Sequence, residues 1–238
     1  MKQINNALRE RIIDKTIEMG ASLVGIASVM DLQKSPTYEL YKSRPYYPSF
    51  EKIPDWSEEN LSILVLALSH APRKPEMDWW DARPGNSPGN RDLIAIQKGI
   101  NKWLVDELKI QARNLPYQVE EGGIFLKDAA VLSGIGIIGK NNLLITPKYG
   151  PHVRLRALFL YVSIEPVELI HFNPCATCSI PCFKACPQKA FRNGYFEREY
   201  CRVQMNIDVE KSRPLDNDPD ILAVRYCRAC EFSCPVGR

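Results

Sequence analysis

Apolar side chains in the first part of the chain recur at two spacings, and each spacing predicts a different element. Residues 3–19 place them three or four positions apart, which predicts an amphipathic helix that ends at Gly20. The apolar positions of this helix are Ile4, Leu8, Ile12, Ile13 and Ile17. Residues 22–29 predict a strand. Residues 62–69, continuously apolar between turn-forming residues, predict a central buried strand.

Helical and strand patterns continue to alternate as far as residue 164. Further helices are predicted over 92–108 and 124–132, and further strands over 117–120, 143–145 and 153–164. Residues 31–60 and 71–90 are rich in turn-forming residues and predict two long irregular loops, the first with one short helix. Long loops of this kind often line a binding site. Strands that alternate with helices indicate an α/β body.

The composition is that of an ordinary globular protein. Hydrophobic residues make up 45% and charged residues 25% of the 238 residues, which excludes disorder, collagen and coiled coil as the main state. The formal net charge of +3 is too small to indicate nucleic-acid binding by itself. The first twenty residues lack the apolar core of a signal peptide, and Glu10 separates Arg9 from Arg11, so no twin-arginine signal is present. No run reaches the roughly 18 apolar residues of a membrane span. We therefore expect a cytoplasmic protein.

The distribution of cysteine changes this ordinary picture. All eight cysteines follow residue 174, so the sequence divides into a cysteine-free body and a compact module. They are Cys175, Cys178, Cys182, Cys186, Cys201, Cys227, Cys230 and Cys234. Because thiols stay reduced in the cytoplasm, a cluster of eight indicates metal or iron–sulfur ligands rather than disulfides.

The spacing of the cysteines is typical of iron–sulfur ligands. The first run, 175–187, is C-x₂-C-x₃-C-x₃-C-P, and the second, 227–235, is C-x₂-C-x₃-C-P. Two-cluster bacterial ferredoxins carry C-x₂-C-x₂-C-x₃-C-P, and the fourth cysteine of that run ligates the other cluster. The first run differs by one inserted residue, Ile180 or Pro181. Two Cys₄ zinc sites are the main alternative, and they also need eight thiolates.

The ferredoxin pattern predicts a crossed assignment to two [4Fe–4S] clusters. One set is Cys175, Cys178, Cys182 and Cys234. The other set is Cys186, Cys201, Cys227 and Cys230. Cys201 replaces the first cysteine of a second complete run. Two clusters imply a terminal electron acceptor, which the body is large enough to hold.

A segment of the body, together with the module, resembles a known family. Residues 127–145, KDAAVLSGIGIIGKNNLLI, are followed by Tyr149-Gly150, a predicted strand and the cysteine module. This order resembles epoxyqueuosine reductase, with the corrinoid-dependent reductive dehalogenases as more distant relatives. The resemblance is close over roughly 117–238 and weaker over 1–116. It implies a cobalamin in the α/β body, reduced through the clusters.

The resemblance also implies particular site residues. The family's catalytic aspartate lies fourteen residues before the first glycine of its glycine segment, and that position here is Glu120, the expected proton donor. A carboxylic acid suits this role if burial raises its pKa; otherwise Glu120 is a solvated charge. The glycine segment and the residues after it are the expected corrinoid contacts: Gly134, Gly136, Gly139, Lys140 and Asn141.

Other residues have simpler interpretations. The segment 134–139 fits G-x-G-x-x-G, but it follows a helix and precedes a strand, so it is not a dinucleotide fingerprint. His70, His152 and His171 lack metal-ligand spacing and are expected to be structural or surface residues. Trp79 and Trp80 are expected either to stack on a cofactor or substrate or to pack in the core.

The sequence therefore predicts an α+β protein in two domains. An α/β cobalamin-binding body of the nitroreductase-like kind spans 1–170, and a two-cluster bacterial ferredoxin-like module spans 171–238. The expected activity is that of an oxidoreductase, a cobalamin-dependent iron–sulfur reductase. The alternatives are an electron-transfer protein that activates the corrinoid of a partner protein, and a flavin-binding iron–sulfur reductase.

The expected partners follow from this function. They are a low-potential donor of the ferredoxin or flavodoxin type and a small-molecule substrate or corrinoid protein, with no membrane. The sequence stops four residues after Cys234, whereas many epoxyqueuosine reductases continue into a helical-repeat segment that helps to hold tRNA. Ile137 also replaces the family's aromatic residue. Both departures argue against a tRNA substrate.

Overall fold

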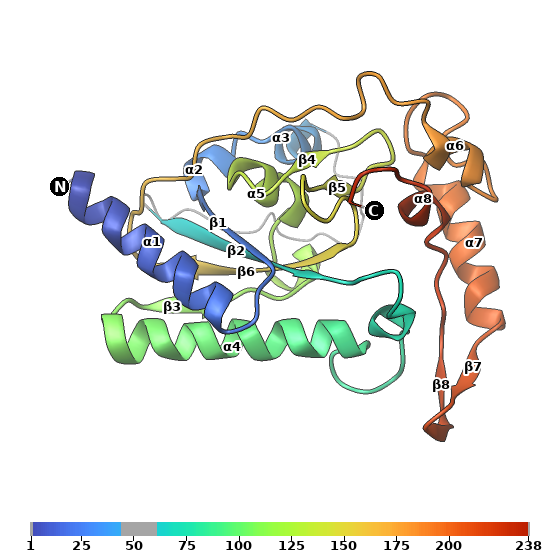
Figure 1. The fold of residues 1–238 in the computed structure, drawn as a ribbon, viewed down its shortest axis with the longest axis horizontal. Helices are drawn as coiled ribbons and strands as arrows, with labels where there is room; N and C mark the ends of the chain where they lie inside the picture. Colours follow the sequence, from blue (N-terminus) through green and yellow to red (C-terminus); the bar gives the residue numbers. More distant parts are fainter. Residues whose placement is uncertain (1, 44–60, 238) are drawn as a thin grey trace. The chain divides into compact units, whose positions relative to one another are not determined.

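The computed structural model describes residues 2–43 and 61–237, and the chain forms two compact units. The first unit is Met1–Leu68, Leu93–Gly136 and Leu155–His171, and the second is Ser69–Asp92, Ile137–Arg154 and Phe172–Arg238. Figure 1 follows the chain through both. The domain boundary predicted between residues 170 and 171 stays a prediction. One change of unit falls at His171, but the second unit also takes in 69–92 and 137–154.

The main sheet has four strands in the order β1-β2-β6-β3. They are β1 (Leu23–Ser28), β2 (Ser62–Ser69), β6 (Val153–Leu160) and β3 (Ala112–Asn114). The pairs β1–β2 and β3–β6 are antiparallel. Strands β2 and β6 are antiparallel too. At the start of β2, Ser62 Oγ accepts from the Ile164 N–H, which lies beyond the end of β6. After the end of β2, the His70 N–H donates to His152 O, which lies before the start of β6. The predicted position of 62–69 as a central strand is confirmed.

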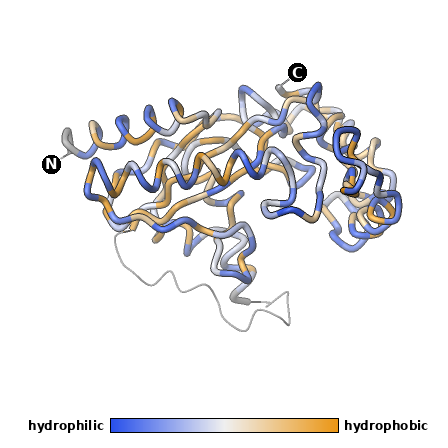
Figure 2. Tube along the Cα trace, turned by 90° about the horizontal axis from the view of Figure 1, so that it is seen from below, coloured by the Kyte–Doolittle hydropathy of each residue, from blue (hydrophilic) through white to orange (hydrophobic). Residues whose placement is uncertain are grey.

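One face of the sheet is covered by two long helices, α1 (Lys2–Glu18) and α4 (Pro88–Leu108). Ile12 of α1 and Ile100 of α4 pack with Leu64 of β2 and Leu158 of β6 in one buried cluster. Alternate strand residues supply this cluster because successive side chains of a strand point to opposite faces. Figure 2 shows hydrophilic and hydrophobic colours alternating along α1, beside the N-terminus. The predicted helix is present, but of its predicted apolar positions Ile12 is buried whereas Ile17 is exposed.

The opposite face carries two shorter helices, α2 (Val29–Leu32) and α5 (Leu126–Leu132). Gly25 of β1 faces α5, and a Cβ atom at this position would lie 2.1 Å from Ser133 O, the carbonyl at the end of the helix. Only glycine therefore lets β1 approach the end of α5 this closely.

The strand predicted over 117–120 is wrong. The chain forms β3 earlier, at 112–114, and then a 3₁₀ turn, η2 (Val119–Glu121). Gly122 ends this turn with φ 92°, and both Gly122 and Gly123 donate back to carbonyls of 118–119. Glycine in the left-handed region closes a turn, whereas a strand needs extended backbone. The pair Gly122-Gly123 therefore decides against the strand.

The two predicted loops are only partly irregular. The first contains the end of α2 and then α3 (Pro36–Ser43), and its residues 44–60 lie outside the described residues. The second contains η1 (Pro75–Asp78) and one isolated bridge, Trp80 with Val224, before α4 begins at Pro88. Within the described ranges, no helix is long and apolar enough to cross a membrane.

The second unit consists of short elements. They are β4 (Ile137–Ile138), β5 (Leu144–Ile145), α6 (Pro181–Ala185), α7 (Arg198–Glu210), β7 (Arg213–Leu215), β8 (Asp218–Ala223) and α8 (Ala229–Phe232). Helix α7 leads into the β7–β8 hairpin, and α6 packs against α8 (Figure 1). Apart from the 13-residue helix α7, these elements are no longer than six residues.

Two glycines fix the chain beyond Cys234 against the turn before β6. Gly150, at φ 53°, bridges back to Thr146, and a Cβ atom on it would lie 1.9 Å from Val236 O. A Cβ atom on Gly237, at φ 77°, would lie 2.2 Å from Gly150 N. The two backbones therefore touch directly, and this contact positions the segment that carries Cys234.

We predict opposite effects for two glycine-to-alanine changes in the first unit. Gly25→Ala should lower the free energy of unfolding by about 2–4 kcal/mol, because the new methyl group meets the Ser133 carbonyl. Gly99→Ala, inside α4 and 3.7 Å from Met19 Sδ, should raise it by about 0.5–1 kcal/mol through helix propensity. Denaturant unfolding followed by circular dichroism measures both. Equal stability of Gly25→Ala and wild type would contradict the packing described.

A second pair of variants tests the contact of Gly150. Gly150→Ala adds a backbone clash to the cost of the left-handed conformation and should destabilise the protein by about 2–4 kcal/mol. Gly194 has a similar φ of 85° with nothing within 4 Å, so Gly194→Ala should cost only about 1–2 kcal/mol. Thermal unfolding of the two variants gives the comparison, and equal losses would rule out the clash.

Candidate metal centre

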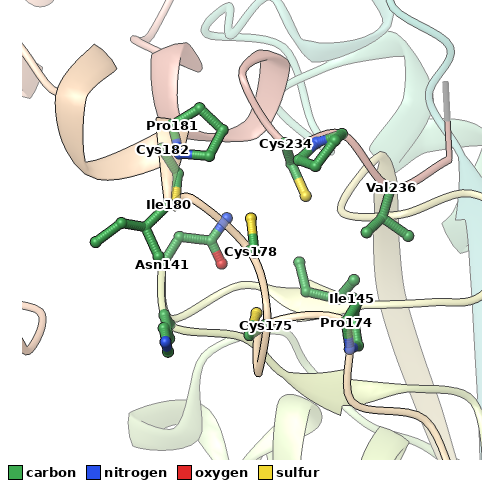
Figure 3. A pocket seen from close by; sticks show the side chains of 12 residues that line it. Asn141, Ile145, Pro174, Cys175, Cys178, Ile180, Pro181, Cys182, Cys234 and Val236 are labelled. Carbon is green, nitrogen blue, oxygen red and sulfur yellow. The ribbon is translucent and has the colours of Figure 1, made fainter.

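Four cysteines line one pocket of the second unit. Cys175 and Cys178 lie in the loop before α6, Cys182 lies in α6, and Cys234 follows α8. Figure 3 shows their sulfur atoms around the same space. The rest of the lining is largely apolar: Ile145, Pro174, Ile180, Pro181, Pro235, Val236, Lys140 and Asn141.

The inserted residue of the first run has a distinct conformation. Ile180, directly before α6, adopts φ 51° and ψ 52°, and Pro181 then begins the helix. A β-branched residue in the left-handed region is uncommon and costs about 1–3 kcal/mol. The insertion is therefore a sharp turn between the C-x₂-C loop and the helix that holds Cys182.

The other four cysteines lie near one another. Burial raises the pKa of the Cys230 thiol to about 12, and the neighbouring thiols of Cys227, Cys201 and Cys186 act in the same direction. For Cys201, burial is again the main cause of a raised pKa, followed by Cys186 and Cys227. The thiols that raise the pKa of Cys182, after burial, are Cys234 and Cys178. Cys175, Cys178, Cys182 and Cys234 thus share one pocket, and Cys186, Cys201 and Cys227 are neighbours of Cys230. The assignment of each set to a cluster stays a prediction.

The eight cysteine side chains are not equally accessible to solvent. No disulfide joins any two of them. Cys182 and Cys234 are buried, whereas Cys227 is exposed. Within residues 2–43 and 61–237, no three His, Cys, Asp or Glu side chains converge closely enough to hold a single metal ion.

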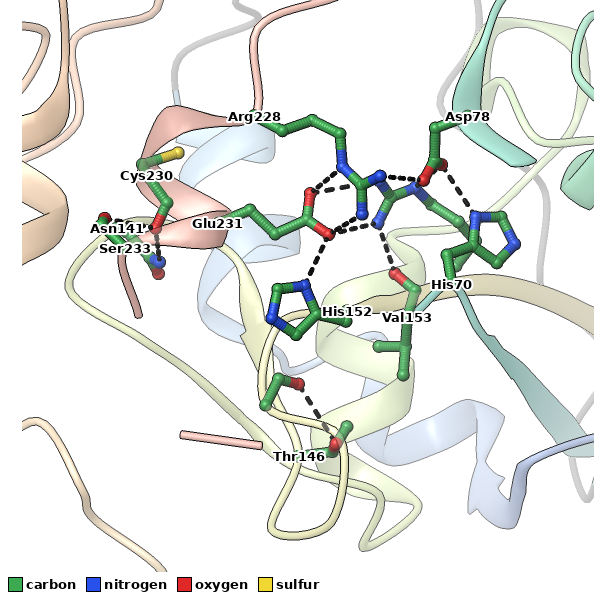
Figure 4. Close-up of polar contacts among 12 residues, drawn as sticks. His70, Asp78, Asn141, Thr146, His152, Val153, Arg228, Cys230, Glu231 and Ser233 are labelled. Carbon is green, nitrogen blue, oxygen red and sulfur yellow. Dashed lines mark hydrogen bonds and ion pairs between the residues drawn. The ribbon is translucent and has the colours of Figure 1, made fainter. Parts of the chain in front are cut away.

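A buried network of charges anchors the second cysteine run. Figure 4 shows the guanidinium group of Arg228 between the carboxylates of Asp78 and Glu231. Arg228 Nη1 lies 2.5 Å from Asp78 Oδ2, and Arg228 Nε donates to Glu231 Oε2 at 2.9 Å. Arg154 joins the same two carboxylates, with Nε 2.8 Å from Asp78 Oδ1 and Nη2 3.1 Å from Glu231 Oε2. Two cations and two anions therefore alternate in one closed arrangement.

A histidine lies at each end of this network. His70 Nδ1 is 2.8 Å from Asp78 Oδ1, and His152 Nδ1 is 3.3 Å from Glu231 Oε1. Burial acts to raise the pKa of Asp78, but its bond with His70 and the charges of Arg154 and Arg228 hold that pKa below its usual range. The pKa of Glu231 is lowered in the same way by Arg228, His152 and Arg154. His70 and His152 are thus structural, and His171 is exposed, as predicted.

The two tryptophans pack against the segment that leads into the second cysteine run. The Arg225 guanidinium lies 3.9 Å from the ring centroid of Trp79, and Trp80 meets Tyr226 edge-on with centroids 5.9 Å apart. Sequence reasoning missed Asp78, Arg228 and Glu231. The sequence does carry one indication of this network. Arg228 and Glu231 are three residues apart on either side of Cys230, a spacing that places opposite charges on one face of a helix.

The residues predicted to contact a corrinoid have other contacts. A Cβ atom on Gly134 would lie 2.7 Å from Glu168 O, and one on Gly139 would lie 2.6 Å from Ile145, so the space beside both is filled by the chain itself. Gly136 is buried. Exposed Lys140 and buried Asn141 line the cysteine pocket, and the Asn141 amide donates to Cys230 O at 3.4 Å. A corrinoid contact for these five residues stays a prediction.

Glu120, the predicted proton donor, lies in the first unit on η2 and is exposed. The burial that the predicted role requires is therefore missing in this conformation. Tyr41, at the end of α3, is its neighbour: burial raises the pKa of Tyr41, and the negative charge of Glu120 raises it further. The charge of Glu120 therefore acts on the Tyr41 hydroxyl.

Comparison with known proteins identifies relatives of two kinds. No family model matches the chain. Epoxyqueuosine reductase from Pseudomonas aeruginosa is 29% identical over 189 residues, covering 75% of this chain and 52% of that protein. Tetrachloroethene reductive dehalogenase from Sulfurospirillum multivorans is 37% identical over 119 residues, covering 46% of this chain and 23% of that protein. The chain thus spans about half the length of the first relative.

Solved structures give the same two kinds. Epoxyqueuosine reductase with an epoxyqueuosine-modified tRNA-Tyr stem loop matches 98% of this chain and 66% of its own with a TM-score of 0.67 and 20% identity. The Bacillus subtilis enzyme is described with its catalytic aspartate loop swung out of the active site. It matches this chain with a TM-score of 0.63 and 19% identity, at the same coverage. A reductive dehalogenase described as B12-dependent matches with a TM-score of 0.58 and 16% identity, covering 94% of this chain and 31% of its own.

These matches confirm the resemblance found in the sequence. The shared fold is a mixed α/β fold, and the named relatives are reductases. By sequence and by fold, the chain is a relative of the epoxyqueuosine reductases and, over a smaller share of their length, of the reductive dehalogenases.

Proposed function

We propose that this chain is a cobalamin-dependent iron–sulfur reductase of the epoxyqueuosine reductase kind. The observation that carries the proposal is the grouping of all eight cysteines into two sets of four, one of them around a single pocket. In this proposal the sets bind two [4Fe–4S] clusters, which carry electrons one at a time to a corrinoid in the first unit. The cysteine segment is then a ferredoxin-like module, and the first unit a nitroreductase-like body.

The donor set fits iron–sulfur clusters. Four thiols around a largely apolar pocket match the all-cysteine ligation of a [4Fe–4S] cluster. The raised pKa values of Cys182, Cys201, Cys227 and Cys230 reflect burial and crowded like charges. A bound cationic core would lower the pKa values of these thiols instead, since ligation deprotonates them. Each cysteine of a cluster binds a different iron, so the sulfur atoms need not converge on one point.

The exposure of the two sets gives electron transfer a direction. Cys227 is exposed, whereas Cys182 and Cys234 are buried. We therefore assign electron entry to the set of Cys227, where a ferredoxin- or flavodoxin-type donor has access. The set of Cys182 and Cys234 then passes electrons onward.

The corrinoid is supported by the relatives rather than by the glycine segment of this chain. One neighbour of the same fold is described as B12-dependent. Gly134 and Gly139 are already packed against their own chain, so we assign them no cofactor contact. Anaerobic reconstitution with cobalamin tests this point: a visible spectrum of bound cobalamin supports the reductase, whereas about eight irons per chain without cobalamin binding supports the electron-transfer or flavin alternative.

An epoxyqueuosine-containing tRNA stem loop is the first substrate to test. A structural neighbour that matches 98% of this chain holds such a stem loop, which outweighs the expectation against tRNA drawn from the sequence. The dehalogenase relatives make a small organohalide the second substrate class. Turnover of either by the reconstituted enzyme with a low-potential reductant distinguishes the two.

The crossed ligand sets predict which cysteine variants behave alike. Replacing Cys175 or Cys234 by Ala should remove the same cluster, and replacing Cys186 or Cys227 should remove the other, because each cluster loses one of four ligands. Iron analysis should fall from about eight toward about four in each variant, and paramagnetic resonance of reduced samples should identify the remaining cluster. Removal of the same cluster by Cys182→Ala and Cys186→Ala would contradict the assignment. Wild-type protein with zinc in place of iron would overturn the function itself.

Glu120 is proposed to donate the proton, after η2 moves from its exposed position toward the substrate. The catalytic loop of the Bacillus subtilis relative is described as able to swing out of its active site. Glu120→Gln should lower turnover about 10²–10⁴-fold, the usual contribution of a positioned acid, with both clusters retained. Glu121→Gln removes a charge from the next residue on the same exposed turn and should change turnover by less than about threefold. Equal activity of the two variants would refute the assigned role.

A further inference from the structure

Asp208 is the one carboxylate that helix α7 turns toward the set of Cys186, Cys201, Cys227 and Cys230. We call the cluster proposed for this set the outer cluster. Cys201, Gln204 and Asp208 are three and four residues apart, so they lie on one face of the helix. The Cys227 N–H donates to Asp208 Oδ2 at 2.7 Å, across from that face. The carboxylate therefore sits between two cysteines of the proposed outer cluster.

Both oxygens of Asp208 are held in place. Gln204 Nε2 donates to Oδ1 at 2.8 Å, and Gln188 Nε2 in turn donates to Gln204 Oε1 at 3.0 Å. The side chain is half-buried. A carboxylate fixed by two donors and partly shielded from water keeps its charge at a constant distance from the cysteines.

The charge of Asp208 is also uncompensated by its bonding partners. The donors that bond it are a backbone N–H and an amide, and both are uncharged. Glu231 beside Cys230 is different, because Arg154 and Arg228 pair with it. At Cys201, the opposing influence of Arg198, at the start of α7, is smaller than that of Asp208. The negative charge of Asp208 is therefore felt at Cys201 and Cys227.

We propose that Asp208 holds the reduction potential of the outer cluster low. This inference rests on the proposed function, because it requires a cluster bound by Cys186, Cys201, Cys227 and Cys230. Reduction adds one electron from a low-potential donor, with no bond made and no proton taken up. Because a fixed negative charge opposes the added electron, the outer cluster gives that electron up more readily. Net charge and hydrogen bonds near a cluster are the factors that set its potential.

The Cys227 N–H strengthens the effect. An N–H group that donates to a cluster sulfur raises the potential, but this N–H is directed to Asp208 instead. Asp208 thus lowers the reduction potential in two ways. It adds a negative charge, and it accepts the hydrogen bond of an N–H group that a cluster sulfur would otherwise accept.

The test is a redox titration of anaerobically reconstituted protein, followed by paramagnetic resonance. Asp208→Asn removes the charge but keeps an oxygen that accepts from the Cys227 N–H. At the wild-type midpoint of the outer cluster, the ratio of reduced to oxidised cluster should rise about tenfold, which corresponds to about 59 mV for one electron. The ratio of reduced to oxidised cluster at the other site, measured at its own wild-type midpoint, should change by less than about threefold.

Two control variants separate charge from structure. Glu210→Gln removes an exposed charge at the end of the same helix and should leave the ratio within about twofold of wild type. Asp208→Glu keeps the charge and should also stay within about threefold. An unchanged ratio in Asp208→Asn, equal shifts in Asp208→Asn and Asp208→Glu, or loss of the cluster from Asp208→Asn would each overturn the role of Asp208. Absence of two clusters from wild-type protein would instead refute the proposed function.

Discussion

The buried pairing of Arg228 and Glu231 with Asp78 and Arg154 is the interaction on which the second unit depends. Most helices and strands of this unit are no longer than six residues, and the ion pairs join segments of it that lie far apart in the sequence. Breaking one partner of a buried ion pair costs about 3–5 kcal/mol, because the remaining charge is left without a counter-ion in a desolvated place. The four groups come from three separate segments of the sequence, and together they hold the second cysteine run on the rest of its unit.

The local pattern of the sequence predicted those elements whose reasons are local. The strand at 62–69 and the helix that ends at residue 108 follow from continuous or periodic apolar residues. The strand predicted over 117–120 failed because Gly122-Gly123 closes a turn that outweighs two apolar positions. The antiparallel order of the sheet was not predictable, since it depends on pairing between residues far apart in sequence.

The same contrast holds for the candidate site. Cysteine spacing predicted two sets of four, because chelation of a cluster restricts the spacing of its ligands. The resemblance predicts cofactor contacts at the glycines 134 and 139, but the sequence does not show that the Cβ side of each faces its own chain. Asp78, Asp208 and Glu231 were missed because charged residues are ordinarily at the surface, and their partners are known only once the chain is folded.

The order of the cysteines along the chain has a consequence for assembly. In the proposed assignment, Cys182 and Cys234 belong to one cluster, and all four ligands of the other lie between them. The first cluster therefore closes a loop that contains the second site entirely. Closing a loop lowers the entropy of the unassembled chain, much as a cross-link does. The longest gap between ligands of the second cluster, Cys201 to Cys227, is shorter than the gap from Cys182 to Cys234, so its closure loses less chain entropy. The nesting of the ligands thus makes the exposed cluster the natural first step, because its binding shortens the loop that the buried cluster must close.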